Sequence, residues 1–380
     1  MKTIIIGGGI GGLCAAIALQ KAGIEAEVYE AAPELKPVGA GVGLAANAIQ
    51  GLERLGVAQE VIALGKQLTA LVMLDENGDV ISNQDTRSLS EKYGVNNFVV
   101  HRAALHQVLQ NHLKPGSLFL NKRCESINQQ GDTVEVTFTD GSHTSADLLI
   151  AADGINSVIR QKLLPDSKPR YAGYTCWRAV IENPGLPINK MVSAETWAPQ
   201  GRIGMAPLPG NLVYWYVCLN APERDPRMQQ MTPAQLSAHF SGAHGPVQAI
   251  LAATKPEQLI WGDIADLAPL KQFVYGRVVL LGDAAHATTP NLGQGACQAI
   301  EDAVVLGQCL QNHKDLKAAL RKYEKRRIAR TTKIIRLSRL LGWVAQWQHP
   351  VLTKARNMLL RTTPAFATKR QMEYIFKVDF

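Results

Sequence analysis

The feature that most restricts the fold is a glycine-rich turn placed directly after a short apolar segment. Lys2–Ile6 has the pattern of a buried strand, and the chain continues as Gly7-Gly8-Gly9-Ile10-Gly11-Gly12. Residues 11–22 then show the apolar spacing of a helix, and Glu25–Glu30 has the pattern of a second strand. This order of elements predicts a βαβ unit at the start of a parallel sheet.

The four glycines Gly7, Gly9, Gly11 and Gly12 lie in the spacing G-x-G-x-x-G of dinucleotide-binding turns. They permit a tight turn and let a pyrophosphate approach the backbone N–H groups at the helix N-terminus. Glu30 lies 18 residues after Gly12, where an acid accepts hydrogen bonds from ribose hydroxyls. The alternative is a glycine-rich turn in an ordinary α/β domain, and the position of Glu30 favours nucleotide binding.

A second strand–turn–helix signal near the end of the chain indicates which dinucleotide is bound. A strand ends at Leu281-Gly282-Asp283-Ala284-Ala285-His286, and Pro290-Asn291-Leu292-Gly293-Gln294-Gly295 opens another helix. The free N–H groups of this helix start suit the negative charge of a reduced flavin, and Asp283 is placed to hold a polyol such as a ribityl chain. Unless the segment is purely structural, the pair of motifs favours FAD over NAD.

The pattern of apolar and polar residues changes in the chain between these motifs. Near residues 171–275, alternating segments such as Leu212–Val217 and Pro/Gly-rich connections predict a largely antiparallel sheet. We therefore expect an α/β protein with a discontinuous Rossmann-like FAD-binding domain (1–70, 97–170 and 276–330). We expect an inserted, mostly antiparallel substrate domain (71–96 and 171–275) and a basic C-terminal helical segment (331–380).

Composition limits the partners. No stretch reaches the roughly 20 apolar residues of a membrane-spanning helix, so we expect a soluble, cytoplasmic protein. The six cysteines are scattered without zinc spacing, so we expect them to be reduced and expect no metal site. The net charge of +8 comes from the tail, because residues 321–380 hold 15 Lys and Arg against 3 Asp and Glu.

These motifs resemble those of the FAD-dependent aromatic hydroxylases of the p-hydroxybenzoate hydroxylase type, and above all their salicylate, zeaxanthin-epoxidase and urate hydroxylase branches. The resemblance covers residues 1–330 and rests on the glycine turn, on Asp153-Gly154, and on Gly282-Asp283 with Gly293-Gln294-Gly295. It implies that NADH or NADPH reduces FAD, and that O2 then adds to flavin C4a as a hydroperoxide that oxygenates an electron-rich ring. The cofactor carries this chemistry, so no protein nucleophile is needed.

The resemblance also implies site residues. It assigns FAD contacts to Ala31, Gly43, Arg102, the backbone of Cys124, Asp153, Gly154, Asp283, Gly293, Gln294, Gly295, Ala296 and Cys297, in addition to the glycine turn and Glu30. Ser157 and Arg160 match the segment that family members use for both FAD and the nicotinamide nucleotide. For Arg102 the alternative is a solvated cation at a helix start, and for Asp153-Gly154 it is a plain turn.

The substrate site is expected on the inserted sheet. Arg202 and Tyr214 resemble in position the arginine and tyrosine of the urate hydroxylase branch, and Arg178 is a rival to Arg202. The alternative is that each of these residues is an ordinary strand residue without a role in substrate binding. Pro290 is expected to shape the pocket beside the flavin, whereas His286 fits a structural hydrogen bond better than a proton shuttle. Thr175-Cys176-Trp177 looks more like the epoxidase branch, which argues against urate as the substrate.

Several alternatives stay open at this stage. A reductase or dehydrogenase on the same fold would use the same motifs, as would a membrane-associated flavin-binding protein without turnover. The basic helix after Arg321 is expected to cap its own domain, with peripheral membrane contact as the alternative. We expect a monomer or homodimer that acts on a small aromatic or conjugated-ring substrate and does not bind nucleic acid, because no recognition motif accompanies the charge.

Overall fold

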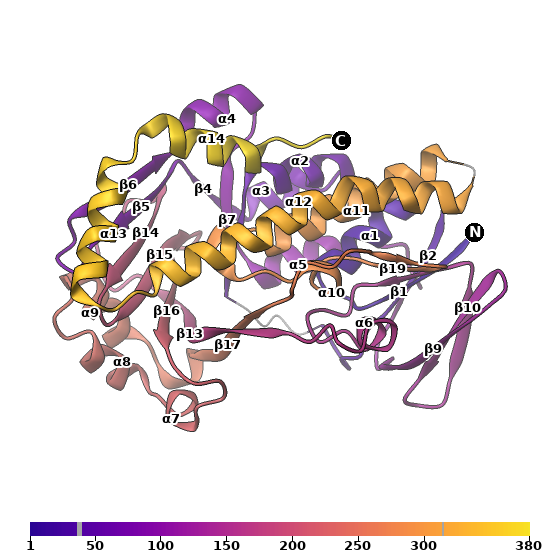
Figure 1. Ribbon diagram of the computed structural model, residues 1–380, viewed down its shortest axis with the longest axis horizontal. Helices are drawn as coiled ribbons and strands as arrows, with labels where there is room; N and C mark the ends of the chain where they lie inside the picture. The colour runs from indigo at the N-terminus through magenta and orange to yellow at the C-terminus, as the bar shows by residue number, and fades with distance from the viewer. Residues whose placement is uncertain (36–39, 314) are drawn as a thin grey trace.

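The computed structural model describes residues 1–35, 40–313 and 315–380. It has an α/β architecture, as the sequence predicts, and a 30-residue helix runs along much of the long axis of the molecule (Figure 1). No helix in these described ranges is long and apolar enough to span a membrane.

The first layer is a six-stranded sheet that carries both sequence motifs. Its order is β18 (Val274–Tyr275), β19 (Val278–Leu280), β12 (Leu148–Ala151), β1 (Lys2–Ile6), β2 (Glu25–Tyr29) and β8 (Leu118–Phe119). All neighbours are parallel except β18 and β19. Its central strands are buried on both faces, which explains their continuous apolar sequence.

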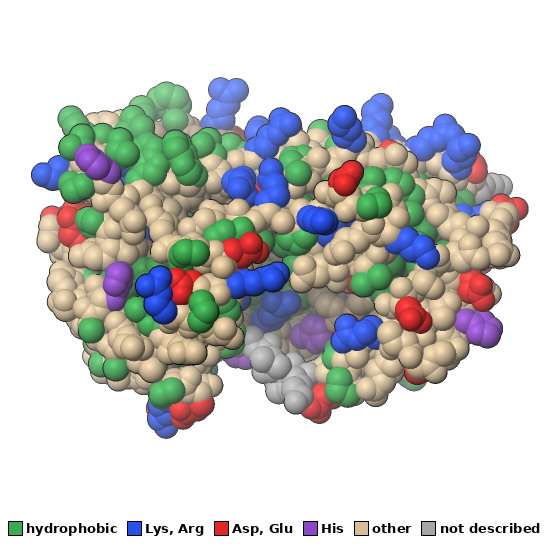
Figure 2. Space-filling view, turned by 60° about the horizontal axis from the view of Figure 1, so that its bottom comes forward, with side chains coloured by type: hydrophobic (Ala, Val, Ile, Leu, Met, Phe, Trp, Pro, Cys, Tyr) green, Lys and Arg blue, Asp and Glu red, His purple; other side chains and the backbone are tan. Residues whose placement is uncertain are grey.

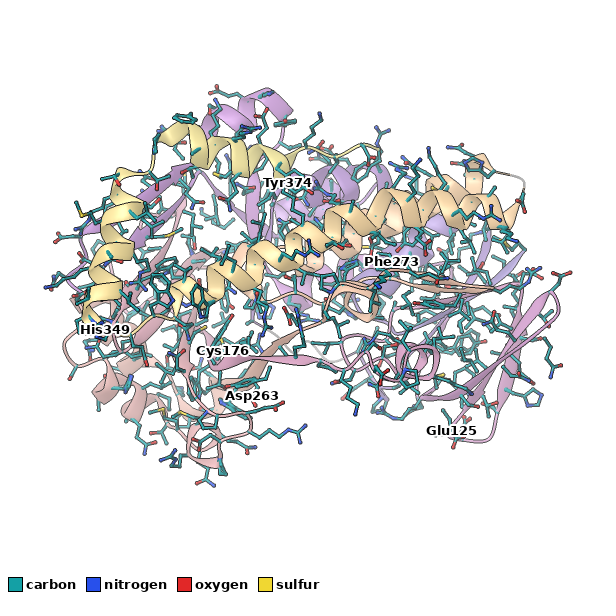
Figure 3. The ribbon with its side chains drawn as sticks, in the orientation of Figure 1. Glu125, Cys176, Asp263, Phe273, His349 and Tyr374 are labelled. Carbon is teal, nitrogen blue, oxygen red and sulfur yellow. The ribbon has the colours of Figure 1, made fainter. Side chains whose placement is uncertain are left out.

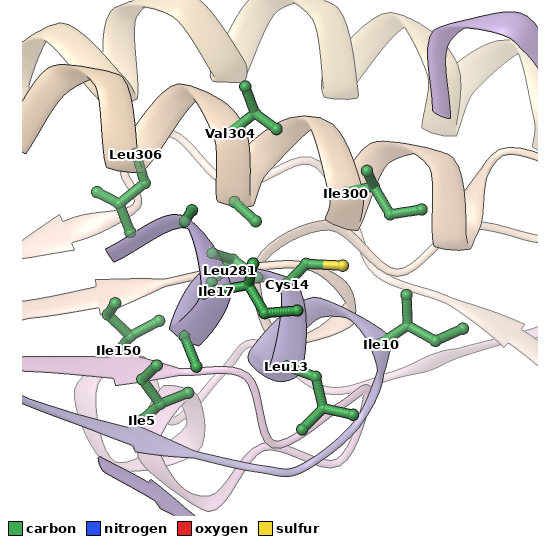
Figure 4. Close-up of a cluster of buried hydrophobic side chains, with 14 of the residues drawn as sticks. Ile5, Ile10, Leu13, Cys14, Ile17, Ile150, Leu281, Ile300, Val304 and Leu306 are labelled. Carbon is green, nitrogen blue, oxygen red and sulfur yellow. The ribbon is translucent and has the colours of Figure 1, made fainter. Parts of the chain in front are cut away.

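A group of helices packs against this sheet and against one another: α1 (Ile10–Lys21), α2 (Ala46–Leu55), α3 (Ala58–Ala63), α5 (Arg102–Asn111) and α11 (Gly295–Asn312). α1 contacts β1 and β2, α11 contacts α1 and α2, and α5 contacts α1 and α3. α1 and α11 approach closely because both present small residues: a Cβ on Gly307 would lie 3.0 Å from the Cβ of Ala18. Figure 4 shows the core between them and the sheet, where Ile17 and Leu281 lie between Ile150 and Val304. The two motif-bearing helix starts are therefore parts of one packed unit.

Two small three-stranded sheets complete this part of the molecule. One has the order β11 (His143–Ala146), β10 (Thr133–Phe138) and β9 (Cys124–Gln130), and it adds Val134 and Val136 to the same core. The other has the order β3 (Gly41–Leu44), β7 (Asn97–His101) and β4 (Gly65–Leu68). Short helices α4 (Arg87–Tyr93), α6 (Val158–Leu163) and α10 (Asp283–His286) and a 3-10 turn at Pro290–Leu292 connect the layers.

The second layer is a seven-stranded sheet. Its order is β17 (Ile260–Asp266), β13 (Arg170–Glu182), β16 (Leu212–Asn220), β15 (Gly201–Leu208), β14 (Val192–Ala198), β5 (Ala70–Leu74) and β6 (Val80–Asp85). Only β14 and β5 pair in parallel. One face packs on α8 (Pro233–His239) and α9 (Gly245–Ala253) through a core that contains Trp177 and Trp215. The chain also forms α7 (Pro226–Gln229) and a 3-10 turn at Pro256–Gln258.

Three helices end the chain: α12 (Leu316–Ala345), α13 (Pro350–Thr362) and α14 (Ala365–Phe376). α12 runs from α11 to the seven-stranded sheet, so the expected boundary at residue 330 falls inside one helix. The C-terminus returns to the first layer, where Arg326 donates to the carbonyl of Asp379 and Arg54 to that of Phe380. The domain bounds themselves stay a prediction.

Candidate active site

The glycine turn has the geometry that a diphosphate site requires. Gly7 has φ +106°, and a Cβ there would lie 2.4 Å from the carbonyl oxygen of Ala152. A Cβ on Gly12 would lie 2.0 Å from the carbonyl oxygen of Gly7. Gly9 caps α1 and has open space around its Cβ position. Two of these glycines are therefore needed for the turn itself, and the third leaves room for a ligand beside the helix N-terminus.

Glu30 follows β2 and faces this turn. Its carboxylate accepts hydrogen bonds from the N–H of Gly8 (2.6 Å) and from the N–H of Ala32 (2.8 Å), with the half-buried Ala31 between them. A carboxylate has about four acceptor positions, so capacity remains for ribose hydroxyls. His106 Nε2 lies 2.7 Å from the carbonyl oxygen of Gly8, a contact that no sequence motif predicts.

Asp283 lies at the second motif and opens α10. The residue is solvent accessible, yet protein surrounds its carboxyl closely enough that burial raises the pKa of Asp283; the charges of His286 and Arg102 act in the opposite direction. It has no hydrogen bond within the described residues. A Cβ on Gly295, at the start of α11, would lie 4.0 Å from its Oδ1. Asp283 thus lies beside the α11 N-terminus and close enough to the exposed Arg102 of α5 for the two charges to interact.

The start of α11 leaves room on the same side. Gly293 has φ +61° and precedes the helix, and neither its Cβ position nor that of Gly43 has an atom within 4 Å. The thiol of Cys297 lies 3.7 Å from the carbonyl oxygen of Gly43, so β3 packs against the helix start. The half-buried Ala296 follows Gly295 in the first turn, whose N–H groups have no partner within the helix.

A buried ionic network, which the sequence analysis missed, holds these two segments. Asp302 accepts hydrogen bonds from the N–H of Gly282 (2.8 Å), from His286 Nε2 (2.5 Å) and from Arg327 Nε (2.6 Å). Burial alone would raise the pKa of Asp302, but the charges of His286 and Arg327 lower it to about 2. Arg327 also pairs with Glu301 at 2.6 Å. His286 therefore has the structural role that its position favoured.

The same network continues to α2. The amide of Asn47 donates to Glu301 (2.5 Å) and to the buried Gln294 (3.0 Å), and Arg330 pairs with Glu301. Gln294 is thereby fixed in the turn that opens α11. Its Nε2 is buried without a hydrogen-bond partner in the described structure. A donor left free at this position is suited to a ligand acceptor.

The segment after β12 borders the first motif. Asp153 follows the strand, and burial raises its pKa; its Oδ1 is buried without a partner among the described residues. Gly154 has φ +80° and open space around it. Arg160 donates to the carbonyls of Ile155 (2.6 Å) and Ala284 (3.2 Å), which connects this segment to α10. Burial raises the pKa of the Cys124 thiol to about 12, so only its backbone fits a binding role.

The seven-stranded sheet turns the face opposite to α8 and α9 toward the first layer. Strand pairing places Arg202 beside Cys218 and, beyond it, Cys176, which is labelled in Figure 3. The next row holds Gly204, Tyr216 and Arg178. Tyr214 lies one row further, and a Cβ on Gly41 of β3 would lie 2.6 Å from its ring. The sheet face thus contacts β3 at Tyr214.

The two candidate arginines on this face differ in their surroundings. Arg202 is buried and donates to Glu195 (3.0 Å), Gln346 (2.9 Å) and Asn291 (3.0 Å), so each of its nitrogens has a partner. The side chain of Arg178 is half-buried and forms neither an ion pair nor a hydrogen bond with any described residue. Pro290 is exposed and begins the turn that also carries Asn291. Arg178 is therefore the arginine with free donors.

Comparisons with known proteins identify relatives of this chain. A family model described as an FAD binding domain matches residues 1–338. The chain is 36% identical over 362 residues to the aurachin C monooxygenase/isomerase of Stigmatella aurantiaca, covering 95% of this chain and 94% of the relative. It is 36% identical over 368 residues to an FAD-dependent urate hydroxylase of Klebsiella pneumoniae, with the same coverage.

Solved structures give the same result. The crystal structure of Klebsiella pneumoniae HpxO complexed with FAD and uric acid superimposes with a TM-score of 0.91 at 33% identity, covering 98% of this chain and 96% of that one. A salicylate hydroxylase, at 24% identity and a TM-score of 0.79, shares the fold. The chain belongs to the FAD-dependent aromatic-ring monooxygenases.

Proposed function

We propose that this monooxygenase uses NADH or NADPH and O2 to hydroxylate or epoxidise a small aromatic or conjugated-ring compound. The observation that carries the proposal is that the accessible carboxyl of Asp283 lies beside the α11 N-terminus, while the seven-stranded sheet holds Tyr216 and the unpaired Arg178 in one row. FAD is the enzyme's cofactor, and when bound it supplies electron transfer from the nicotinamide and activation of oxygen.

The chain's own residues fit FAD at both ends. The open space at Gly9 and the carboxylate of Glu30 suit the ADP half, while Arg102 suits the pyrophosphate. The accessible carboxyl of Asp283 and the buried donor of Gln294 suit the ribityl chain and the flavin ring. The unpaired Oδ1 of Asp153 offers an acceptor for FAD or for the nicotinamide nucleotide.

The substrate residues are proposed from the sheet face. Burial raises the pKa of Tyr214 and of Tyr216, so both are neutral phenols near neutral pH and can donate hydrogen bonds to a ring oxygen. Arg178 offers a guanidinium fork for a carbonyl, carboxylate or enolate on the ring. Arg202 and Pro290 line the same site, with Arg202 fixed by Glu195 and thereby holding Asn291 beside Pro290.

The test is substrate-stimulated NADH or NADPH oxidation in air, with the product analysed by mass spectrometry under isotopically labelled O2. Urate, 6-hydroxynicotinate and 2-heptyl-4-quinolone are the first compounds, because relatives are named for reactions of these ring types. Incorporation of labelled oxygen supports the proposal. Turnover of a ring compound without label from O2 identifies a dehydrogenase or reductase instead, and FAD that NAD(P)H never bleaches identifies a binding protein.

The variants Arg178→Gln and Arg202→Gln are compared to test which arginine contacts the ring of the substrate. We expect Arg178→Gln to raise the substrate KM by about tenfold or more, which corresponds to one charge-assisted hydrogen bond. Arg202→Gln leaves Glu195 buried without its cation, so we expect it to lower thermal stability as well. An unchanged KM in Arg178→Gln would remove this arginine from the substrate site.

We also propose that the enzyme acts in the cytoplasm as a monomer or homodimer. All six cysteines are free and buried, which fits a reducing compartment. Sedimentation of the purified holoenzyme decides between the two oligomeric states.

A further inference from the structure

Helix α13 and the adjoining ends of α12 and α14 carry an unusual number of exposed apolar side chains. Of the twelve large apolar residues that are exposed in the described ranges, seven lie between residues 340 and 366, with 45% to 73% of each side chain accessible. We call this set the α13 face; its members are Leu340, Trp343, Val351, Leu352, Met358, Leu359 and Phe366. A concentration of this kind marks an interaction surface rather than scattered surface residues.

Helix geometry shows that α13 is amphipathic. With 3.6 residues per turn, positions 351, 352, 358 and 359 fall within an arc of about 120°. The opposite side holds the buried Thr353 and Arg356. Arg356 stacks over the ring of Trp197 at 4.9 Å and donates to the carbonyl of Ala345, so this side anchors the helix to the sheet. The apolar arc is therefore turned outward by the packing and is not required for it.

The helices that carry this arc have a positive charge. Residues 350–372 contain five Lys and Arg and no Asp or Glu. Lys354 on α13 and Lys369 and Arg370 on α14 are exposed. The turn between β5 and β6 adds Asp75, Glu76 and Asp79 beside α13, and Arg361 pairs with Asp75 at 2.7 Å. In Figure 2 hydrophobic side chains gather at the end of the molecule where α13 lies, at the upper left, with Lys and Arg nearby.

These properties distinguish the possible occupants. In an isologous contact between two copies, the exposed lysines and arginines beside one α13 face would meet those beside the other, which is unfavourable. An anionic lipid surface matches both features: apolar side chains enter the interfacial layer, Trp343 suits that depth, and lysines and arginines meet the headgroups. We propose that the α13 face docks on the surface of an anionic phospholipid bilayer, and that the chain lies on the membrane without crossing it.

The α13 face also lies close to the seven-stranded sheet, on which we propose that ring substrates bind. Gln346, three residues after Trp343, accepts a hydrogen bond from Arg202 Nε at 2.9 Å. Docking through the α13 face therefore places the sheet that we propose for ring substrates next to the bilayer. Ring compounds that partition into lipid would be concentrated there.

The test is flotation of the full-length holoenzyme with two kinds of vesicle, phosphatidylcholine alone and phosphatidylcholine mixed with phosphatidylglycerol. We expect binding to the mixed vesicles at low salt and its loss at high salt. The double variant Met358→Asn/Leu359→Asn should lower the partition coefficient at least about tenfold, because two buried apolar side chains are lost. Lys354→Glu should lower it about fivefold or more.

The matched control is Leu64→Asn/Met191→Asn, which removes two exposed apolar side chains outside the α13 face. It should bind vesicles as the wild type does, and bound flavin in all variants verifies the fold. The proposal is overturned if the wild type does not float with mixed vesicles, or if the control loses as much binding as the α13 double variant. A dimer in sedimentation that Met358→Asn/Leu359→Asn dissociates, without any vesicle binding, would assign the α13 face to a second copy.

Discussion

Replacing Asp302 by Asn tests whether the buried ionic network holds the flavin site. In the wild type one carboxylate oxygen accepts from Gly282 N–H and His286, and the other accepts from Arg327. The amide removes the charge and places an NH2 group against one of these donors. Breaking one partner of a buried ionic cluster costs about 3–5 kcal/mol of the free energy of unfolding.

The lowered pKa of Asp302 gives a second, independent value for the free energy by which this carboxylate stabilises the fold. A shift from 3.8 in the unfolded chain to about 2 in the folded protein corresponds to about 2 kcal/mol at neutral pH. Because the folded-state pKa is lowered, this stabilisation is complete above pH about 4 and is lost as the pH falls toward 2. The difference between wild type and Asp302→Asn should therefore be constant near neutral pH and shrink in acid.

Urea unfolding of the two apo-proteins, followed by tryptophan fluorescence, measures this difference, and flavin titration measures FAD affinity. We expect weaker FAD binding, because Gly282 N–H loses the acceptor that fixes the backbone before Asp283. Asp132→Asn is the control, since this carboxylate is 94% exposed although it pairs with Arg277. If Asp302→Asn unfolds within about 1 kcal/mol of the wild type, or if the control loses as much stability, the network does not have this role.

Four further outcomes follow from the geometry. Asp283→Ala should fold but lose FAD, which flavin content after purification measures. Arg202→Ala should keep FAD but weaken substrate stimulation of NAD(P)H oxidation, and normal stimulation would remove this residue from the substrate site. Gly204→Ala would place a Cβ 2.1 Å from the ring of Tyr216, so the ring must move; we expect a loss of about 1–3 kcal/mol in thermal unfolding. The Cys124 thiol, with its pKa raised to about 12 by burial, should react with a disulfide reagent only after unfolding.

Local motifs alone led to the flavin half of the proposed site. A strand–turn–helix unit has a fixed geometry over a few residues, and only glycine satisfies it at Gly7 and Gly12. The segments at Glu30 and Asp283 carry their acids at strand ends, where side chains of a parallel sheet converge. The sequence also indicated the antiparallel sheet through its period of two, and the α/β class is confirmed.

Partners from distant segments were not predictable, because the tertiary structure selects them. The sequence shows Asp302 as one acid on an apolar helix and Arg327 as one of many cations in a basic tail. Only the packing of α11 against α12 joins them and isolates them from water.

The two arginines of the seven-stranded sheet also show which properties follow from the local sequence and which depend on the tertiary structure. The sequence by itself determined that Arg178 and Arg202 lie on strands, since that depends on neighbouring residues alone. Which of them keeps free donors was decided by Glu195 and Gln346, which strand pairing and α12 bring to Arg202 across long sequence separations. Whether a charge is free or neutralised depends on distances in space, and a linear pattern does not contain those distances.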